Sequence, residues 1–293
     1  MAVGDTELLR NSVCASVAAA ATAGLFNPLD TLRVRWQLSP VLVAQPLAAG
    51  ASLPAFARGI VAAEGLVGGL WRPGFVATMS AMATSGGIRM GCYPHLRDWA
   101  GGGAAKTPGL MFGTGLVAGA AGYWVSCPLF QAKTRLQALG TSTGTTRELL
   151  ALWREGGARG LFRGAGPLVA RGALLGAGQS LGYDGTKTAL SQRSRIMRDG
   201  PALHALASVA AALLGTVLAA PADYVMTRYQ AAAQAGRPFA GPASCLLAVL
   251  REDGAPALFR GWSPFFLRMA PAFVMFHPMY EQLRLLAGLS YMK

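Results

Sequence analysis

The sequence predicts an all-α membrane protein built from three homologous repeats. Of its 293 residues, 53% are hydrophobic and only 13% are charged, and the mean hydropathy is +0.38. A soluble Ala- and Gly-rich enzyme, the alternative class, would need less apolar surface than this. Three runs without Asp, Glu, Lys or Arg, at residues 11–29, 107–132 and 200–222, each approach the ~20 residues that span a hydrocarbon core. Each run ends within a copy of the same motif.

That motif is a proline followed by an arginine and a glutamine at fixed distances. It reads PLDTLRVRWQ from Pro28, PLFQAKTRLQ from Pro128 and PADYVMTRYQ from Pro221. In every copy the arginine comes seven residues after the proline and the glutamine comes nine residues after it. The copies begin 100 and 93 residues apart, so they mark an internal repeat rather than a chance match.

Two further elements follow each copy of the motif. An acidic residue precedes an aromatic residue by seven positions, in EGLVGGLW from Glu64, EGGARGLF from Glu155 and EDGAPALF from Glu252. A tyrosine comes 21 or 22 residues after that aromatic residue, in YPHLR, YDGTK and YEQLR. Each repeat therefore predicts an apolar helix, a proline break, a polar segment and a second helix. The repeats span residues 8–103, 104–198 and 199–288.

The charge and the rare residue types exclude several functional classes. A net charge of +13 favours anionic lipid headgroups or anionic solutes as partners. The sequence has no basic helix with interleaved aromatic residues and no zinc-finger spacing, so we expect no nucleic-acid partner. The four cysteines are scattered without a CxxC pair, which predicts neither a metal site nor a disulfide framework. Without a nucleophile elbow or a phosphate-binding Gly loop, the chain predicts neither an enzyme nor a cofactor.

The repeated elements resemble the mitochondrial carrier family. The likeness rests on three Px[DE]xx[KR] signatures, three acid-Gly segments followed by aromatic-[RK]-G, and three [YF][DE]xx[RK] closings, which together cover residues 8–288. It implies six transmembrane helices arranged as a pseudo-threefold barrel around a water-filled cavity. It also implies short matrix-side helices at about 52–64, 144–156 and 241–253, and transport by alternating access.

Each proline is expected to bend its helix. A proline inside a helix removes one backbone hydrogen bond, so Pro28, Pro128 and Pro221 are expected to kink three helices toward one end of the barrel. Asp30 and Arg33 lie three residues apart just beyond the first bend and share a helix face. An acidic side chain on one helix can therefore meet a basic side chain on the next.

The resemblance implies that these charges close a matrix gate. In it, Asp30 pairs with Lys133 and Asp223 pairs with Arg33. Glutamines hydrogen-bond to the ion pairs from below as braces, and they are Gln37, Gln137 and Gln230. Ion pairs in a wet cavity suit a gate that must open in each cycle.

The third ion pair of this gate is missing on both sides. Phe130 occupies the acidic position of the second repeat, and Met226 occupies the basic position of the third repeat. By the pairing order of the family, the two face each other. Losing one partner would strand a charge, whereas losing both costs much less. We therefore expect an apolar contact between them. Cys127, next to Pro128, is expected to line the cavity near this gate.

The resemblance also implies a second gate at the cytoplasmic end. In the first repeat, Pro94 occupies the position of the acidic residue, so at most two ion pairs are expected in this gate. The charged residues of this gate are Arg97, Asp184, Lys187, Glu281 and Arg284.

Two arginines within the even-numbered helices mark the expected substrate site. Arg171 precedes Asp184 by 13 residues, and Arg268 precedes Glu281 by 13 residues. At ~1.5 Å per residue, each lies ~20 Å from the cytoplasmic gate, near the middle of the bilayer. Intramembrane arginines usually face a water-filled path. Guanidinium groups suit carboxylates, so we expect small organic anions, carboxylates above all.

The resemblance places three substrate contact points at this depth. They are Ala81–Met82, Arg171–Gly172 and Arg268–Met269, with Arg89 as a third positive charge. The segment RMGCY resembles the dicarboxylate, oxoglutarate and uncoupling-protein branch of the family. Those carriers place Arg-Gln where this chain has Ala81–Met82. A smaller anion and an acid with an apolar portion near Met82 both stay open.

The resemblance completes the functional expectation. Cardiolipin is expected as a structural lipid at helix starts marked by Gly74, Gly164 and Gly261. The chain is expected to act as a monomer that exchanges a small anionic metabolite across the mitochondrial inner membrane. An uncoupling-type proton or anion leak is the alternative, and a non-transporting membrane scaffold is a third hypothesis. Peroxisomal and plastid membranes, where relatives occur, also stay open.

Overall fold

Every regular element in the described part of the chain is a helix. The computed structural model describes residues 2–38, 53–101, 107–141, 144–162, 164–193, 201–234, 239–259 and 262–289. Its long helices are α1 (Ala2–Leu25), α4 (Phe75–Gly101), α5 (Pro108–Val125), α8 (Ala165–Arg193), α9 (Pro201–Gln234) and α11 (Trp262–Leu286). The shorter elements are α2 (Asn27–Leu38), α3 (Leu53–Glu64), η2 (Val67–Trp71), α6 (Cys127–Leu139), α7 (Thr145–Leu161), α10 (Pro242–Glu252) and η3 (Ala255–Phe259). The predicted all-α class is confirmed.

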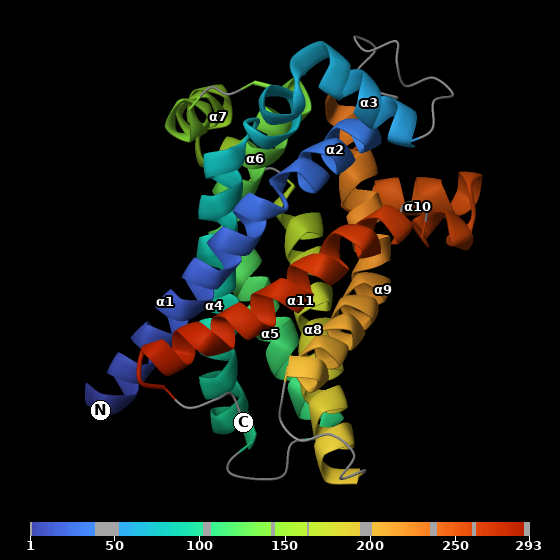
Figure 1. Cartoon of the computed structure of the whole chain (residues 1–293). Helices are drawn as coiled ribbons and strands as arrows, with labels where there is room; N and C mark the ends of the chain where they lie inside the picture. Colours follow the sequence, from blue (N-terminus) through green and yellow to red (C-terminus); the bar gives the residue numbers. More distant parts are fainter. Residues whose placement is uncertain are drawn as a thin grey trace.

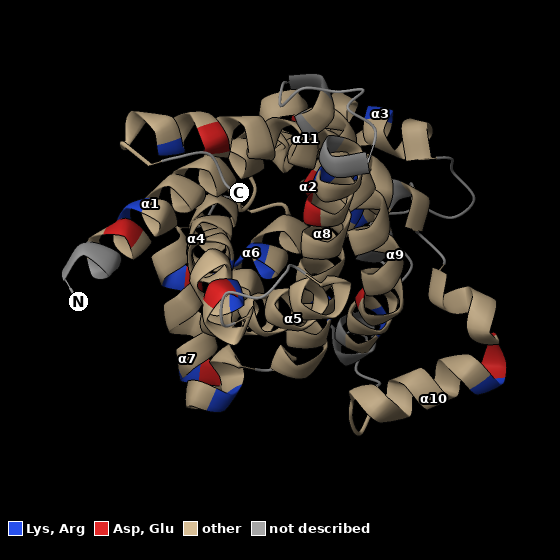
Figure 2. Ribbon diagram, turned by 90° about the horizontal axis from the view of Figure 1, so that it is seen from below, with Lys and Arg blue, Asp and Glu red and all other residues tan. Residues whose placement is uncertain are grey.

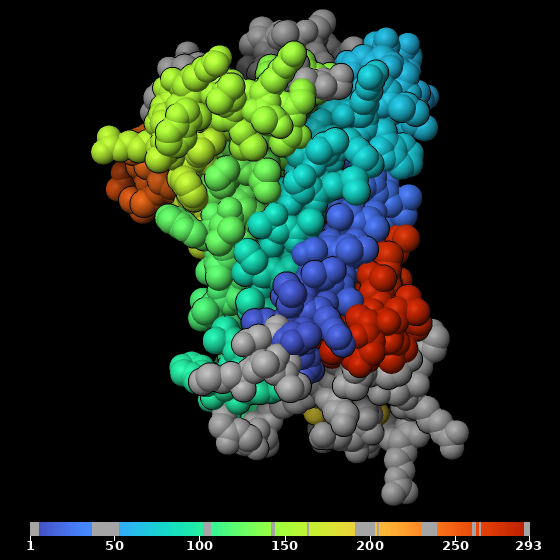
Figure 3. Space-filling model, turned by 90° about the vertical axis from the view of Figure 1, so that its left-hand side faces the viewer, coloured from blue at the N-terminus to red at the C-terminus, as the bar shows by residue number. Residues whose placement is uncertain are grey.

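The six long helices close into a ring. Contacts run from α1 to α4, then to α5, α8, α9 and α11, and α11 returns to α1 (Figure 1). On one face of the molecule, the side chains of α11, α1, α4 and α5 form adjacent bands (Figure 3). The ring is the barrel that three two-helix repeats predict.

The outer faces of the ring carry large apolar side chains. On α1, Leu9, Val13 and Val17 are exposed and lie four residues apart, so they share one helix face. Helix α9 exposes Leu206 and Leu213 in the same way. Such contiguous exposed apolar faces are unusual on soluble monomers and fit contact with lipid chains.

By length and hydropathy alone, only some of the described helices qualify as membrane spans. Thr6–Leu25 and Ala205–Tyr229 do, and so does the bent pair Pro108–Val125 with Cys127–Leu139 when it is counted as one span. The second long helix of each repeat (α4, α8 and α11) falls short because it carries charged and polar side chains among its apolar ones. Arginines on these helices line the cavities described below, so their polarity is turned inward.

The short helices lie toward the end of the ring opposite the two termini (Figure 1). Leu53–Glu64 and Pro242–Glu252 agree closely with their predicted ranges. Helix α7 continues to Leu161, but its backbone leaves helical geometry at Gly157, with φ 57° and ψ −143°. Its regular first part therefore ends where the sequence predicts, because glycine accepts this left-handed backbone without steric cost.

The three prolines lie at different places relative to the helix ends. Pro28 and Pro128 are the second residues of α2 and α6 and lie beyond complete helix breaks, and α6 turns 65° from α5. A proline fits the first turn of a helix because its missing N–H would have no partner there. Pro221, in contrast, lies inside α9, which continues unbroken. The loss of one hydrogen bond does not interrupt α9, which packs closely against α8.

Small residues allow that close packing. A Cβ on Gly119 of α5 would lie 2.5 Å from the backbone oxygen of Gly172 on α8. A Cβ on Gly178 of α8 would lie 2.6 Å from the Cα of Gly215 on α9. Backbone atoms cannot rotate away as side chains can, so these glycines set the separation of neighbouring helices. Glycine at helix interfaces serves the same purpose in membrane proteins generally.

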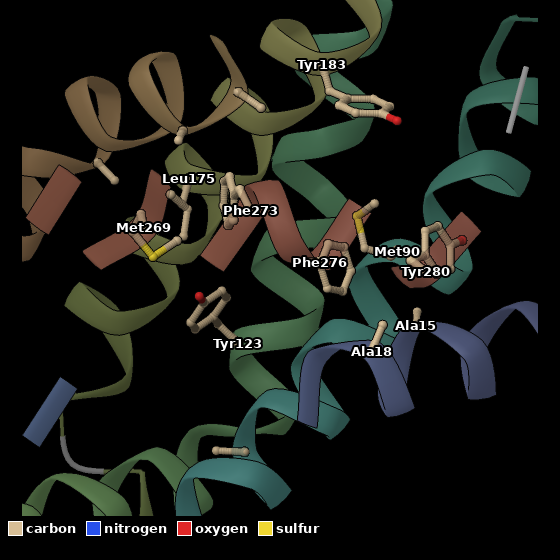
Figure 4. Close-up of a cluster of buried hydrophobic side chains, with 14 of the residues drawn as sticks. Ala15, Ala18, Met90, Tyr123, Leu175, Tyr183, Met269, Phe273, Phe276 and Tyr280 are labelled. Carbon is tan, nitrogen blue, oxygen red and sulfur yellow. The ribbon is translucent and has the colours of Figure 1, made fainter. Parts of the chain in front are cut away.

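Apolar and aromatic side chains fill the ring toward the termini. Phe276 and Tyr280 of α11 stack with ring centroids 5.7 Å apart. In Figure 4 they point toward Met90 of α4, and Ala15 and Ala18 of α1 lie alongside. This cluster joins α11 to α1 and α4, and so closes the ring on the inside.

The packing of α5 against α8 predicts that a larger residue at Gly119 lowers the stability of the protein. Gly119→Ala should lower the stability of the purified protein in detergent by about 1–3 kcal/mol, because the added methyl group forces backbones apart. Gly113→Ala on the same helix is the control, since a Cβ there meets nothing within 4 Å. Thermal unfolding monitored by tryptophan fluorescence measures both. Equal melting temperatures for the two variants would contradict this account of the interface.

Candidate functional site

Two buried carboxylates lie at the centre of the ring, and each contacts two cations. Asp30 of α2 is 5% exposed and Asp223 of α9 is 4% exposed. In Figure 2, charged residues of α2, α6 and α8 lie inside the circle of helices. Because isolated charges are costly to bury, the contacts of these two carboxylates determine how the surrounding helices pack.

Asp30 contacts one cation from the second repeat and one from the third. Lys133 Nζ lies 2.5 Å from Asp30 Oδ2. Arg268, which approaches from α11, places a guanidinium nitrogen 3.2 Å from Asp30 Oδ1. The Asp30–Lys133 pair is the one that the resemblance implies. The contact with Arg268 is additional, because that arginine was assigned to substrate alone.

Asp223 has the same arrangement with different helices. Arg33 of α2 donates a hydrogen bond to Asp223 Oδ2. Arg171 Nε on α8 lies 2.8 Å from Asp223 Oδ1. The expected gate pair again occurs together with a contact from an expected substrate arginine. The gate and the substrate arginines therefore form one cluster in this structure rather than two separate layers, because the long arginine side chains reach the carboxylates.

We call these six residues the central charge cluster. Its members are Asp30, Arg33, Lys133, Arg171, Asp223 and Arg268, and they are between 4% and 8% exposed. Four cations against two carboxylates give the cluster a net charge of +2. Such an excess of buried positive charge is a site for an anion.

One aromatic ring supports three of the four cations. The guanidinium carbon of Arg33 lies 4.7 Å from the ring centroid of Phe265, that of Arg171 lies 5.3 Å away and that of Arg268 lies 5.9 Å away. Phe265 is 1% exposed. A buried ring offers electron density to cations where little water is present. Sequence reasoning missed Phe265, although its place one turn before Arg268 on α11 was a usable signal.

The local sequence of α2 places Asp30 and Arg33 on one helix face, where they reach their partners in the central charge cluster. Asp30 lies in the first turn of α2, where a negative charge is favoured by the helix dipole. Arg33 follows one turn later on the same face. Gln137 on α6 lies with its amide nitrogen 3.3 Å from Asp30 Oδ2 and 3.1 Å from Asn27 Oδ1. It is therefore in the brace position. The side chains of the other two expected braces, Gln37 and Gln230, lie outside the described residues.

Two adjoining cavities meet at the central charge cluster. The first is lined by members of the cluster and also by Phe130 and Met226. The second extends toward the termini and is lined by Arg89 among others, and both cavities share Met82. Phe130 stacks on Tyr123 at a centroid distance of 5.0 Å. Phe130 and Met226 thus border the same space, as their expected contact requires.

The expected substrate residues divide into two groups. Met82, Arg171, Arg268, Met269 and Arg89 line one or both cavities. Ala81 and Gly172 line neither. Ala81 is fully buried, and a Cβ on Gly172 would lie 2.1 Å from the ring of Tyr123. The role of these two positions in the structure is close packing.

Near the termini, an ion pair joins two of the expected cytoplasmic-gate residues, which come from different repeats. Asp184 accepts a hydrogen bond of 2.7 Å from the Tyr93 hydroxyl, and Arg97 lies 3.6 Å from it. Arg284 lies 4.0 Å from Glu281 on its own helix. Lys187 follows Asp184 by one turn on α8 and is half-buried.

Asn11 of α1 was missed by sequence reasoning. Its Oδ1 accepts hydrogen bonds from Arg284 and from the Tyr280 hydroxyl, the latter at 2.6 Å. Pro94 stands where the first repeat should supply an acid, and Asn11 provides an acceptor for Arg284. A neutral amide was not among the residue types expected at a charged gate.

In every repeat, the arginine that follows the motif proline by seven residues contacts an acidic residue further along the chain. This acid is the one that precedes the aromatic residue by seven positions. Arg35 lies 2.9 Å from Glu64, Arg135 lies 2.7 Å from Glu155, and Arg228 lies 3.0 Å from Glu252. The guanidinium of Arg35 also covers Gly140, where a Cβ would lie 1.8 Å from it. These links fix each short helix to its own proline segment.

The remaining expected residues lie at the same end as the short helices. Gly74 and Gly164 have positive φ angles of 62° and 79° and directly precede α4 and α8. Gly261 lies outside the described residues. Cys127 lines neither cavity. Its thiol is buried and lies 3.8 Å from the backbone oxygen of Leu161, so it faces α7. The expectation that Cys127 lines the cavity is therefore wrong for this structure.

Comparisons with known proteins agree with this architecture. The sequence model of the family described as "Mitochondrial carrier protein" matches residues 4–103, 105–194 and 198–289. Mitochondrial brown fat uncoupling protein 1 of Canis lupus familiaris is 29% identical over 93% of this chain and 90% of its own length. Dicarboxylate carrier UCP2 of Danio rerio is 30% identical over 91% of this chain and 88% of its own length. Mitochondrial uncoupling protein 1 of Arabidopsis thaliana is 28% identical over 90% and 89%.

The aromatic support of the central charge cluster is testable. Phe265→Leu keeps an apolar side chain but removes the ring that faces three guanidinium groups. It should lower the free energy of unfolding by on the order of 2 kcal/mol, measured by thermal unfolding in detergent. Phe266→Leu is the control, because that ring stacks on Trp262 at 5.7 Å. A loss no larger than that of the control would show that Phe265 serves only to fill space.

Proposed function

Because the chain belongs to the mitochondrial carrier family, we propose that it is a secondary transporter of small organic anions, above all carboxylates. The proposal places it in the mitochondrial inner membrane and assigns it transport by alternating access. The single observation that carries the choice of an anion is the net charge of +2 in the central charge cluster. The name of one relative, a dicarboxylate carrier, supports the same class of substrate.

An entering carboxylate would compete with the gate for the same guanidinium groups. Arg171 contacts Asp223 and Arg268 contacts Asp30, so a substrate held between the two arginines takes donors from both acids. The acids then keep only Arg33 and Lys133. Substrate binding thus weakens the gate that closes the cavity. The gate opens because the substrate binds the open state more tightly than the closed state.

Contacts at both ends of the ring support alternating access. Asp30–Lys133 and Asp223–Arg33 close the end near the short helices, which we assign to the matrix. Asp184 with Arg97 and Tyr93 closes the other end. Ion pairs can be exchanged for water and counter-charges at modest cost when a cavity opens.

Lipid and oligomeric state are part of the proposal. The starts of α4 and α8, after Gly74 and Gly164, present free backbone N–H groups at the matrix end. A cardiolipin phosphate suits such helix starts. One chain alone closes the ring of helices and lines both cavities. We therefore propose a functional monomer.

An uncoupling-type leak of protons or anions is the second candidate. Two of the relatives are uncoupling proteins by name. Phe130 and Met226 stand where a third matrix ion pair would lie, so the gate has fewer charges to separate. A leak would use the same cavity without requiring a counter-substrate.

The arginines of the cluster provide the first functional test. Arg171→Gln and Arg268→Gln should each reduce the uptake of radiolabelled succinate into proteoliposomes by at least about tenfold, since a hydrogen bond to a charged group contributes roughly 1.5–3 kcal/mol. Arg251→Gln, an exposed arginine on α10, is the control. Folding is checked by thermal unfolding. Wild-type uptake in both cavity variants would exclude this site.

Counter-substrate dependence separates exchange from leak. Liposomes loaded with unlabelled succinate should take up the labelled compound at least about tenfold faster than empty liposomes, if the gate opens only with substrate bound. Uptake that is equal in loaded and empty liposomes would identify the leak. Thermal stabilisation by a panel of metabolite anions, measured on the same protein, ranks the candidate substrates.

A further inference from the structure

A buried histidine lies outside the central charge cluster and is not used by the transport scheme. His277 is 1% exposed and lies within α11, one of the ring helices. Its Nε2 lies 3.1 Å from the amide nitrogen of Gln179 on α8. Gln179 Oε1 in turn accepts a hydrogen bond from Arg89, which lines the second cavity. A continuous polar path therefore joins the cavity to His277.

The hydrogen-bond partners of Gln179 and His277 determine which imidazole nitrogen carries the hydrogen. Arg89 can only donate, so Gln179 must present its oxygen to Arg89 and its NH₂ group to His277. Nε2 of His277 is then the acceptor. Nδ1 lies 2.9 Å from the backbone oxygen of Phe273, which can only accept, so Nδ1 carries the hydrogen. Ser208 Oγ lies 3.1 Å from the same nitrogen.

A proton on Nε2 is incompatible with this arrangement. The charged imidazole has two donors, and Nε2–H would point at the NH₂ group of Gln179. The amide must then turn so that its oxygen faces His277. The turned amide presents its NH₂ group to Arg89, which also only donates. Arg89 must therefore leave Gln179, and the second cavity, which its side chain already lines, provides room for an anion as the new acceptor.

The surroundings of His277 contain further groups that bear on a charge there. Tyr183 of α8 stacks on the imidazole with centroids 4.3 Å apart, and α9 contributes Ser208. On α11, Glu281 follows one turn later, and Arg284 lies a further turn away, where it bonds to Asn11 of α1. From α4, Arg89 acts through Gln179. The path from Arg89 thus ends between an aromatic face and a nearby carboxylate.

We propose that His277 is a proton-binding site coupled to anion binding at Arg89. A proton on Nε2 turns Gln179, releases Arg89 and so strengthens the binding of an anion in the second cavity. By linkage, an anion that withdraws Arg89 from Gln179 strengthens proton binding by the same factor. The inference rests on the proposed function and deepens it: the transported species is an anion together with a proton. The proton forms an N–H bond with the Nε2 lone pair and later leaves it, and no other bond is made or broken.

Ring-nitrogen spectra test the coupling without any transport assay. His95 and His204 are replaced by Asn, so that ¹⁵N labelling reports His277 alone in the purified protein. We expect the neutral Nδ1–H tautomer at pH 7, and added succinate at pH 6 should increase the doubly protonated form. Arg89→Gln should release the amide of Gln179 and reduce the preference for Nδ1–H, whereas Arg251→Gln should not. An Nε2–H tautomer, or no response to Arg89→Gln, would overturn the proposal.

Proteoliposomes test the co-transport. With an enclosed pH-sensitive dye, labelled succinate entering through the wild-type protein should acidify the interior. His277→Gln, whose amide still accepts from Gln179 but takes up no proton, should lower the number of protons per anion by about fivefold or more. His95→Asn, at an exposed position, should not. An unchanged ratio in His277→Gln would overturn the proposal. If no variant moves succinate, the proposed function fails for this anion, and the spectra decide on His277.

Discussion

The sharing of two buried carboxylates among four cations is the interaction on which the rest of the structure depends. Asp30 and Asp223 come from α2 and α9, and their cationic partners come from α2, α6, α8 and α11. Removing either carboxylate would raise the net charge of the cluster from +2 to +3 and leave two cations without their acid. Breaking a buried pair in this way commonly costs 3–5 kcal/mol. The two acids thus tie all three repeats together at one level of the ring. The close glycine contacts between α5, α8 and α9 hold the helices that carry Arg171 and Asp223 at the necessary distance.

Under the proposed function, the same contacts give the interior two roles that oppose each other. A closed gate needs the acids to hold every available cation, whereas a binding site needs cations that are free to accept a new anion. The cluster meets both needs because each acid has two partners, and one partner of each can be exchanged for substrate. Phe265 makes this exchange less costly, because its ring stays against Arg33, Arg171 and Arg268 whichever anion they hold. A neutral, non-exchangeable ring is suited to a site whose other contacts must change.

Much of the fold, and a smaller part of the site, could be predicted from the sequence. The repeats follow from the spacing of the motifs along the chain. The short helices and the Asp30–Lys133 contact were implied by the resemblance to the carrier family, whose pairing order was carried over to the motif positions. The contacts of Arg171 and Arg268 with the gate acids were not, since they depend on how far long side chains reach across the ring. Asn11 and Phe265 were missed for a related reason: an amide and a phenyl ring have no fixed role until their neighbours are known. The unbroken α9 shows that a proline alone does not decide whether a helix ends.

The departures from threefold symmetry bear on the shape of the substrate. The three repeats have equivalent positions at the depth of Arg171 and Arg268, and only α8 and α11 carry an arginine there. The first repeat has Ala81 at this position, and Ala81 is fully buried. Its neighbour Met82 lines both cavities. At this depth Arg171 and Arg268 thus face the space from α8 and α11, whereas α4 presents Met82. A dianion with two separated carboxylates, such as succinate, therefore needs a donor for its second carboxylate on the side of Met82. An acid with one charged end and a short apolar portion satisfies both sides, and Arg89, once released from Gln179, adds a donor on the α4 side for anions that carry a second polar group. Under the proposed function, the asymmetry thus suits carboxylates with one polar end while Arg89 bonds to Gln179, and dicarboxylates once Arg89 is released.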